Sequence, residues 1–298
     1  MPKGQEEPHG ISVVIPAYNE EGVIGEVIDS VSFYLKQAGI PFEIIVVDDG
    51  SQDRTCATLK EKTITVIQHP TNMGYGAALK TGITSSRYRY VAILDADGTY
   101  AEEDLLELIR HMDEYDMVIG ARVGNDVHIP WVRRPAKWIL NKFANFLTET
   151  KIPDLNSGFR IFDKAVVKKF FNFLPSRFSF TTTITIAMLT NGYLIKYVPT
   201  TYRKRKGKSK IRPVRDTINF FALILRTVLY FRPTRIFIPL SLLLIGAGFV
   251  KMIIIDILLI QNMTDSTILL MLTGLQIGFI GLLADLIHKR SMPTTKEH

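Results

Sequence analysis

The sequence predicts an α/β protein, a three-layer sandwich on a mostly parallel β-sheet, followed by a hairpin of two membrane-spanning helices. Short apolar runs of strand length alternate with segments of helical apolar spacing between residues 11 and 120. Each run ends in a polar loop, which is typical of a parallel sheet that binds a ligand at the carboxyl ends of its strands. Farther along, residues 236–287 contain two apolar stretches that are long enough to cross a bilayer.

The net charge and the cysteine content of the chain limit which kinds of partner and cellular compartment we expect. The chain has 298 residues, with 36 Lys and Arg against 29 Asp and Glu, so its net charge is +7. An excess of positive charge favours an anionic partner, and we expect phosphorylated substrates and an acidic membrane surface rather than nucleic acid. Cys56 is the only cysteine, which excludes an intramolecular disulfide. Residues 1–10 are polar and have no signal-peptide core, so the catalytic part is expected in the cytoplasm.

The first six elements follow from apolar spacing and from the residues that end helices. Strands are predicted at 11–16, 42–47 and 64–67, because each is a short run rich in β-branched residues. Helices are predicted after them, since apolar side chains recur there every three or four residues. These helices cover residues 23–38, 54–62 and 77–84.

The fourth strand, 91–94, ends at two carboxylates, Asp95 and Asp97, separated by Ala96. Side chains alternate along an extended chain, so both carboxylates are expected to point the same way from the end of the strand. Two hard oxygen donors suit Mg²⁺ or Mn²⁺, and such an ion suits a diphosphate. For this segment alone, an ordinary Asp-Gly turn after a strand is the alternative.

Four segments in order, VVIPAYNE, VVDDGSQD, NMGYGAALKTG and ILDADG, resemble the nucleotide-sugar half of a family-2 glycosyltransferase with the GT-A fold. The resemblance implies that GDP-mannose or UDP-glucose binds here, that Asp48 hydrogen-bonds the base or ribose, and that the two later aspartates hold metal and diphosphate. Taken singly, Asp48 and Asp49 would be a strand-end turn, and Glu20 a helix N-terminal charge. The nucleotide-sugar residues so implied are Pro16, Ala17, Tyr18, Glu20, Asp48, Asp49, Asn72, Gly74, Asp95, Ala96 and Asp97.

Beyond these segments the sequence predicts a helix over 102–115, a strand over 117–120 and a basic, aromatic segment with Arg133 and Arg134. That segment could be a solvated face, or could lie against a membrane beneath anionic headgroups. Residues 154–162, DLNSGFRIF, resemble the acceptor side of polyprenyl-phosphate glycosyltransferases, the group that includes the dolichyl-phosphate mannose synthases.

No Asp or Glu occurs between Lys164 and Arg215, a region where many inverting glycosyltransferases place a carboxylate base. A phosphate monoester needs no such base, because its second pKa is about 6 and it is mostly a dianion near neutral pH. It needs positive charge, which the segment 202–210, YRKRKGKSK, supplies, although a basic loop could also contact anionic lipid or nucleic acid. The candidates to hold an acceptor phosphate are Arg122, Arg133, Arg134, Ser157, Arg160, Arg205, Ser209 and Lys210.

Three parts are expected: a catalytic domain at 1–211, an interfacial helix at 212–235, and a hairpin with a short tail at 236–298. The membrane spans are placed at about 236–260 and 267–287, with Lys251 forced to pair or snorkel and Asp256 near the far interface. Basic residues flank the outer ends of the hairpin, and only Asp265 lies in its turn, so both termini are expected in the cytoplasm. A homo-oligomer through the hairpin is left open.

These observations together predict an integral membrane, inverting glycosyltransferase that moves mannose or glucose to a dolichyl or undecaprenyl phosphate. Asp97 and Asp95 would hold the metal that neutralises the leaving diphosphate, with Arg122 and Arg205 on the acceptor side. In the mannose synthases the residue two after the second Asp is commonly a glutamine that helps at the metal. Here it is Thr99, which leaves the third metal ligand and the choice of mannose open.

Two alternatives remain. A processive polysaccharide synthase shares the N-terminal half, but it normally adds a Gln-x-x-Arg-Trp motif, and neither Trp131 nor Trp138 sits in one. A non-catalytic membrane scaffold would keep the nucleotide fold only to recruit partners. Such a relative would tend to lose the metal carboxylates, and both are present.

Overall fold

The computed structural model describes residues 8–122, 142, 144–146, 148–176, 179–203, 222 and 225–291. It divides into two compact units, Met1–Phe221 and Ala222–His298, and each is described by itself.

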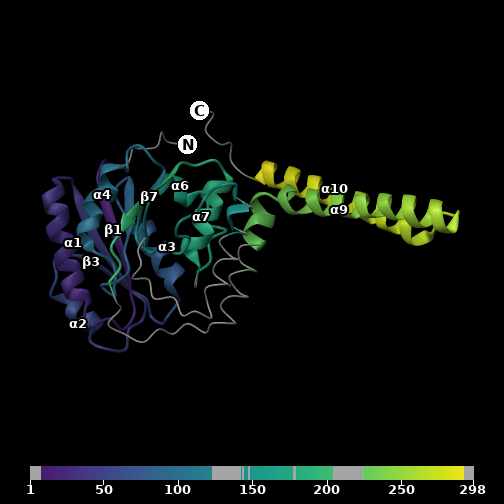
Figure 1. Cartoon of the computed structure of the whole chain (residues 1–298). Coiled ribbons are helices and arrows are strands. Elements are labelled where there is room, and N and C mark those ends of the chain that lie inside the picture. The colour runs from purple at the N-terminus through teal and green to yellow at the C-terminus, as the bar shows by residue number, and fades with distance from the viewer. Residues whose placement is uncertain are drawn as a thin grey trace. The chain divides into compact units, whose positions relative to one another are not determined.

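The first unit is built on a seven-stranded sheet in the order β3-β2-β1-β4-β6-β5-β7. Figure 1 shows the strands of this unit with helices on either side of them. Neighbouring strands are parallel except at β6, which runs antiparallel to both β4 and β5. The predicted α/β fold on a mostly parallel sheet is therefore confirmed. The strands are β1 (Ile11–Ala17), β2 (Phe42–Asp48), β3 (Thr65–Gln68), β4 (Tyr90–Ile93), β5 (Met117–Arg122), β6 (Arg160–Asp163) and β7 (Ile195–Thr200).

Helices cover both faces of this sheet. On one face, α1 (Ile24–Ala38) presents its buried stripe to the sheet and also contacts α2 (Thr55–Lys60) and α4 (Leu105–Arg110). On the other face, α3 (Tyr75–Ser85) packs on β1 and β2 so closely that a Cβ on Gly82 would clash with Val14. The structure also describes η1 (Glu102–Asp104), α6 (Lys164–Lys168) and α7 (Phe180–Thr190) in this unit. The arrangement places every parallel strand's carboxyl end at an edge where loops can meet.

The structure differs from the sequence-based expectation in four elements, one of which is α6 (Lys164–Lys168), a short helix that was not predicted. The helix expected over 102–115 is a short 3₁₀ turn, η1, followed by α4, which ends at Arg110. α7 and β7 were not predicted. α7 is Thr-rich and buried on nearly all sides, so its sequence carries no apolar stripe with a helical period. β7 is an edge strand of mixed burial, and its alternation is correspondingly weak.

The second unit is a helical hairpin. Two helices are long and apolar enough to cross a membrane, over Thr234–Ile260 and Asp265–Ile287. The first consists of α9 (Thr234–Lys251) continued by a π-helix, η3 (Met252–Ile260), and the second is α10 (Asp265–Ser291). Small residues line their contact: Ser241 donates to the Gly274 carbonyl at 2.7 Å, and Gly278 lies against the same serine. Small residues let two helix backbones approach closely where no water drives their association.

The polar residues of the hairpin pair with one another near its turn. Lys251 donates to Asp256 at 3.2 Å, to Thr264 at 2.6 Å and to Thr267 at 2.8 Å. The expectation that Lys251 pairs is therefore confirmed. Asp256 is also buried and accepts from the Thr264 backbone N–H at 3.2 Å, and its expected place near the far interface stays a prediction. Pairing removes the cost of an isolated charge in an apolar segment.

Candidate active site

The loops that follow β1 and β2 interlock through reciprocal hydrogen bonds. Ser51 accepts through its hydroxyl from the Asn19 backbone N–H at 3.0 Å, and the Asn19 side chain accepts from the Gln52 N–H at 2.8 Å. Thr55 accepts from the Glu20 N–H at 2.9 Å. Asn19 has φ +57°, a left-handed conformation that Asn adopts more readily than most residues. These bonds fix the two loops relative to each other at the edge of the sheet.

A pocket of about 490 Å³ opens at the carboxyl ends of β1, β2 and β3. Its walls come from the loops just described and from the loop after β3. The lining residues are Tyr18, Gly50, Ser51, Gln52, Gln68, His69, Pro70, Thr71 and Asn72. Gly50 has φ +73°, and a Cβ there would lie 2.7 Å from the Thr71 carbonyl carbon, so only glycine lets the two loops close.

Asp48, the last residue of β2, leads directly into this pocket's residues and is fully buried. Its Oδ1 accepts from the Ser51 N–H at 2.9 Å, whereas Oδ2 is buried and has no hydrogen-bond partner among the described residues. A buried carboxylate oxygen without a partner is unfavourable, and a ligand N–H would satisfy it. This geometry suits the base or ribose contact expected of Asp48.

Asp49 holds the loop after β3 instead. Its carboxylate accepts from the backbone N–H groups of Met73 at 2.9 Å and Gly74 at 2.8 Å. His69 Nδ1 lies 2.7 Å from Asp49 Oδ1, and its Nε2 lies 3.0 Å from the Thr81 hydroxyl. Asp49 therefore fixes the position of Asn72 and Gly74, and its own contact with a nucleotide stays a prediction.

Asp95 and Asp97 lie just beyond β4, which ends at Ile93. Both side chains are partly exposed, so ligands can reach them. Tyr75 donates its hydroxyl to Asp95 Oδ1 at 2.8 Å, while Asp97 Oδ1 accepts from the Thr99 hydroxyl at 2.6 Å. Burial and then the Asp95 charge raise the pKa of Tyr75 well above its usual range, so the hydroxyl remains a donor.

These two carboxylates fit a divalent ion that a diphosphate also binds. Mg²⁺ is held in such sites by one or two carboxylates together with substrate phosphates and waters. No group of three or more His, Cys, Asp or Glu side chains gathers in the part of the chain that the structure describes. Thr99 is buried and bonded to Asp97, so it orients that carboxylate.

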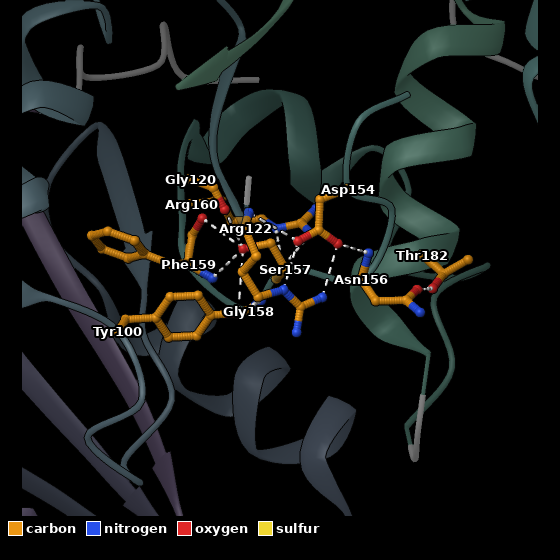
Figure 2. A network of polar contacts seen from close by, with 10 residues as sticks. All are labelled: Tyr100, Gly120, Arg122, Asp154, Asn156, Ser157, Gly158, Phe159, Arg160 and Thr182. Carbon is orange, nitrogen blue, oxygen red and sulfur yellow. Dashed lines mark hydrogen bonds and ion pairs between the residues drawn. The ribbon is translucent and has the colours of Figure 1, made fainter. Parts of the chain in front are cut away.

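Behind Asp95 lies a buried polar cluster, here called the Ser157 network: Tyr100, Gly120, Ser157, Gly158, Phe159 and Arg160 (Figure 2). Ser157 donates to the Gly120 carbonyl at 2.6 Å, and Tyr100 accepts from the Gly158 N–H at 2.9 Å. The backbone of Gly158 lies directly against the Asp95 carboxylate. Residues 154–162, which are expected to contact the acceptor, therefore lie against Asp95, which is expected to hold the metal.

Ser157 and Arg160, which were expected to contact an acceptor phosphate, are both fully buried and bonded within the protein, so their contact with an acceptor stays a prediction. The Arg160 guanidinium donates to the carbonyls of Ser157 and Thr181 and, at 2.8 Å, to the Thr185 hydroxyl. Burial lowers the pKa of this guanidinium. Its role is to join β6 to α7.

Arg122, at the end of β5, forms a two-pronged ion pair with Asp154, with Nε to Oδ2 at 2.6 Å and Nη2 to Oδ1 at 2.8 Å (Figure 2). The guanidinium also lies 5.2 Å from the centre of the Tyr202 ring. Burial opposes the charge of each partner, but their mutual hydrogen bonds outweigh it. The pKa of Asp154 is lowered as a result, and that of Arg122 is raised. The Arg122 charge is therefore largely balanced within the protein.

This ion pair has a predictable pH dependence. A carboxyl whose pKa is lowered by folding adds stability above its unfolded pKa of about 3.9, and loses it as the pH falls through the folded value. Asp154→Asn should therefore lower the melting temperature by a constant amount between pH 5 and 8, with a gap that closes below about pH 4. Asp29→Asn, which breaks an exposed pair with Lys62, is the control and should change little at any pH. A gap that widened in acid would contradict the assignment.

The other expected residues are placed as follows. Pro16 and Ala17 end β1 and are buried, Ala96 is buried between the two carboxylates, and Glu20 is half-buried with its N–H bonded to Thr55. Arg133, Arg134, Arg205, Ser209 and Lys210 lie outside the described residues. The sequence reasoning missed Tyr75 and Asp154, although both stand within segments that it had singled out, and Tyr100, which lies two residues beyond such a segment.

Comparison with known proteins gives two matching family models. One described as "Glycosyl transferase family 2" matches residues 12–171, and one described as "GtrB C-terminal hairpin" matches residues 232–289. The fold is similar to that of glucosyl-3-phosphoglycerate synthase from Mycobacterium tuberculosis, solved with Mn²⁺, UDP and phosphoglyceric acid. That similarity has a TM-score of 0.58 at 22% identity, over 74% of this chain and 78% of the other.

Two curated relatives extend the comparison. Polyprenol monophosphomannose synthase of Mycolicibacterium smegmatis is 30% identical over 215 residues, which are 67% of this chain and 80% of the relative. Dodecaprenyl-phosphate galacturonate synthase of Rhizobium johnstonii is 22% identical over 296 residues, which are 93% of this chain and 87% of the relative. The second alignment includes the hairpin. The matched family model, the GT-A fold and the two carboxylates that follow β4 agree with one another. The chain belongs to glycosyl transferase family 2.

Proposed function

We propose that this glycosyltransferase moves mannose or glucose from a nucleotide diphosphate sugar to a polyprenyl phosphate, with inversion at the anomeric carbon. The observation that carries the proposal is the contact between Asp95 and Gly158, since it brings the expected acceptor segment against the expected metal site. Relatives named for sugar transfer to polyprenyl or dolichyl phosphate support this acceptor class. The hairpin supports a lipid acceptor, because it would hold the catalytic unit at the membrane.

On the donor side, Asp48 would bind the nucleoside and Asp95 with Asp97 would hold Mg²⁺ or Mn²⁺. The ion, when bound, neutralises charge on the leaving diphosphate. Thr99 keeps Asp97 oriented, and the interlocked loops after β1 and β2 fix Tyr18 and Ser51 at the pocket. Preorganised groups of this kind lower the barrier without reorganising during the reaction.

On the acceptor side, positive charge must come from residues that are not already paired. Arg122 is bonded to Asp154 through two of its nitrogens, and Arg160 is buried. We therefore assign the phosphate to the basic segments, with Arg133, Arg134, Arg205 and Lys210 as the candidates and Ser209 as a hydroxyl donor. No Asp or Glu lies between Lys164 and Arg215, which agrees with an acceptor that arrives deprotonated.

Acceptor charge is the direct test of the function. The full chain in detergent, with Mn²⁺ and either GDP-mannose or UDP-glucose, should glycosylate a polyprenyl phosphate at least a hundredfold faster than the free polyprenol, as measured by product mass. Arg205→Ala or Lys210→Ala should each weaken acceptor use about ten- to a hundredfold, because a charged hydrogen bond is worth roughly 1.5–3 kcal/mol. Donor binding should be unchanged.

The contradicting results are also definite. Equal rates with the free polyprenol would refute recognition by charge. A product containing several linked sugars would favour the processive synthase instead. Nucleotide binding without transfer to any acceptor in the panel would favour the non-catalytic scaffold.

We also propose that the catalytic unit lies on the cytoplasmic face. Basic residues flank the outer ends of the hairpin, and its turn carries only Asp265. Protease added outside sealed right-side-out vesicles should spare the catalytic unit and reach at most residues 261–266. Cleavage near Gly207 from outside would reverse the orientation.

A further inference from the structure

The Asp95 carboxylate is enclosed by two residues from distant parts of the chain. Tyr75, the first residue of α3, donates its hydroxyl to Oδ1 at 2.8 Å. The backbone of Gly158 lies against the carboxylate as well, and a Cβ added to Gly158 would be 2.6 Å from Oδ1 and 2.7 Å from Cγ. The Asp95 carboxylate therefore accepts a hydrogen bond from Tyr75 and is blocked by the Gly158 backbone, which is here called the wall.

The wall is itself held in place. Tyr100 is 2% exposed and accepts from the Gly158 N–H at 2.9 Å, which fixes the peptide that touches Asp95. Ser157, the preceding residue, is tied to the Gly120 carbonyl at 2.6 Å (Figure 2). Gly158 cannot retreat without breaking these buried bonds, so the carboxylate cannot swing in that direction.

We propose that Tyr75 is a positioning residue that, together with Gly158, aims the Asp95 carboxylate at the divalent ion of the donor site. The inference rests on the proposed function only in its donor half, namely that Asp95 and Asp97 bind an ion together with a nucleoside diphosphate. Tyr75 acts through Asp95 and touches neither substrate nor ion.

The physical reason lies in the freedom of a carboxylate. Rotation about the Cβ–Cγ bond of Asp is broad and roughly two-fold, so an unrestrained group samples many orientations. The Tyr75 hydroxyl occupies one acceptor position on Oδ1, and Gly158 restricts the rotation. The orientation of the Asp95 carboxylate is then set before an ion arrives. Outer partners of metal ligands typically change metal affinity 10- to 100-fold when removed.

The test is Tyr75→Phe, which removes the hydroxyl and keeps the ring. Mn²⁺ binding to the full chain in detergent is measured by electron paramagnetic resonance, in the presence of UDP and, separately, of GDP. We expect about tenfold weaker Mn²⁺ affinity, a rise of the same size in the Mn²⁺ concentration needed for half-maximal rate, and a turnover restored at saturating Mn²⁺. Nucleotide binding in EDTA should be unchanged.

Tyr90→Phe is the matched control. Tyr90 also donates its hydroxyl to an aspartate, Asp113 Oδ1, at the same distance of 2.8 Å, but it lies at the start of β4, the end opposite Asp95. This variant should keep wild-type Mn²⁺ affinity. Gly158→Ala, which displaces the carboxylate from the other side, should weaken Mn²⁺ binding like Tyr75→Phe.

Each outcome decides a separate question. Wild-type Mn²⁺ affinity in Tyr75→Phe, or a loss equally large in Tyr90→Phe, would overturn the role of Tyr75. A wild-type protein that binds nucleotide but no Mn²⁺ would overturn both this role and the metal site. A wild-type protein that binds Mn²⁺ with nucleotide but glycosylates no polyprenyl phosphate would refute the proposed function alone, and the two variants would still decide the role of Tyr75.

Discussion

Replacing Asp97 with alanine should lower the rate of sugar transfer by two to three orders of magnitude while the protein remains folded. The side chain is partly exposed beyond the end of β4, so its loss creates no cavity in the core. What is lost is the proposed ligand of a divalent ion that would stabilise negative charge on the leaving group, and removal of one stabilising group of this kind costs about 10²–10³ in turnover. Product formation and the melting temperature should be measured on the same preparation.

Two companion variants make this result specific. Thr99→Val removes the hydroxyl that bonds Asp97 at 2.6 Å and should cost about tenfold, because the carboxylate remains but is no longer oriented. Asp29→Ala removes an exposed aspartate that is distant from Asp97 in the sequence, and it should leave sugar transfer unchanged. Near wild-type turnover of Asp97→Ala with Mn²⁺ or Mg²⁺ present would remove Asp97 from the metal site.

The largest effect on stability is expected for Arg160→Leu. The guanidinium is fully buried, and its loss would leave the carbonyls of Ser157 and Thr181 without their donor. Buried polar groups left unpaired, together with the repacking of a large side chain, place this change at roughly 3–5 kcal/mol. For a unit of this size each kcal/mol corresponds to about 2–4 °C, so the melting temperature should fall by roughly 6–20 °C.

Arg89→Leu is the control for Arg160→Leu, because it makes the same change of charge and side-chain size at another position. Arg89 is half-exposed and pairs with Asp163 at 3.0 Å, at the end of the same pair of strands, β4 and β6. Solvent screens this pair, so its removal should cost less than about 1 kcal/mol. Equal destabilisation by the two changes would show that Arg160 has no special place in the core.

The sheet and the nucleotide side of the site were predictable because their signals are local. The strands Ile11–Ala17 and Phe42–Asp48 are short apolar runs, and each is followed directly by a loop that carries polar residues of the site. The carboxylates after β4 follow their strand in the same way. A parallel sheet then brings these loops together without any further information.

Arg160 was expected to face an acceptor because it is a charged residue in a glycine-containing motif, whereas the structure buries it. Phe159 and Ile161 lie on one face of the extended chain and Phe162 on the face of Arg160, so the segment already indicates a strand with both faces covered, in which an arginine must find partners inside. Those partners, Thr181 and Thr185, lie on α7, and nothing in the sequence pairs a threonine-rich helix with this strand. The Tyr75–Asp95 contact was missed for a related reason, since it joins the first residue of α3 to the loop after β4, which only the finished sheet brings together.

The antiparallel strand β6 has a consequence for how the chain assembles during synthesis. It occupies the place between β4 and β5, and β5 is joined to the sheet only through β6 and β7. A ribosome that has produced the first 122 residues has therefore made β5 without any strand for it to pair with, and β4 presents an open edge. β4 and β5 can pair only when residues 160–163 have been made and have formed β6 between them. Pairing of segments so far apart in the chain is slow compared with pairing between neighbouring strands. Because Gly158 comes just before β6 in the chain, the wall against Asp95 is completed in the same event that joins the two parts of the sheet, so the proposed metal site stays incomplete in a shorter nascent chain.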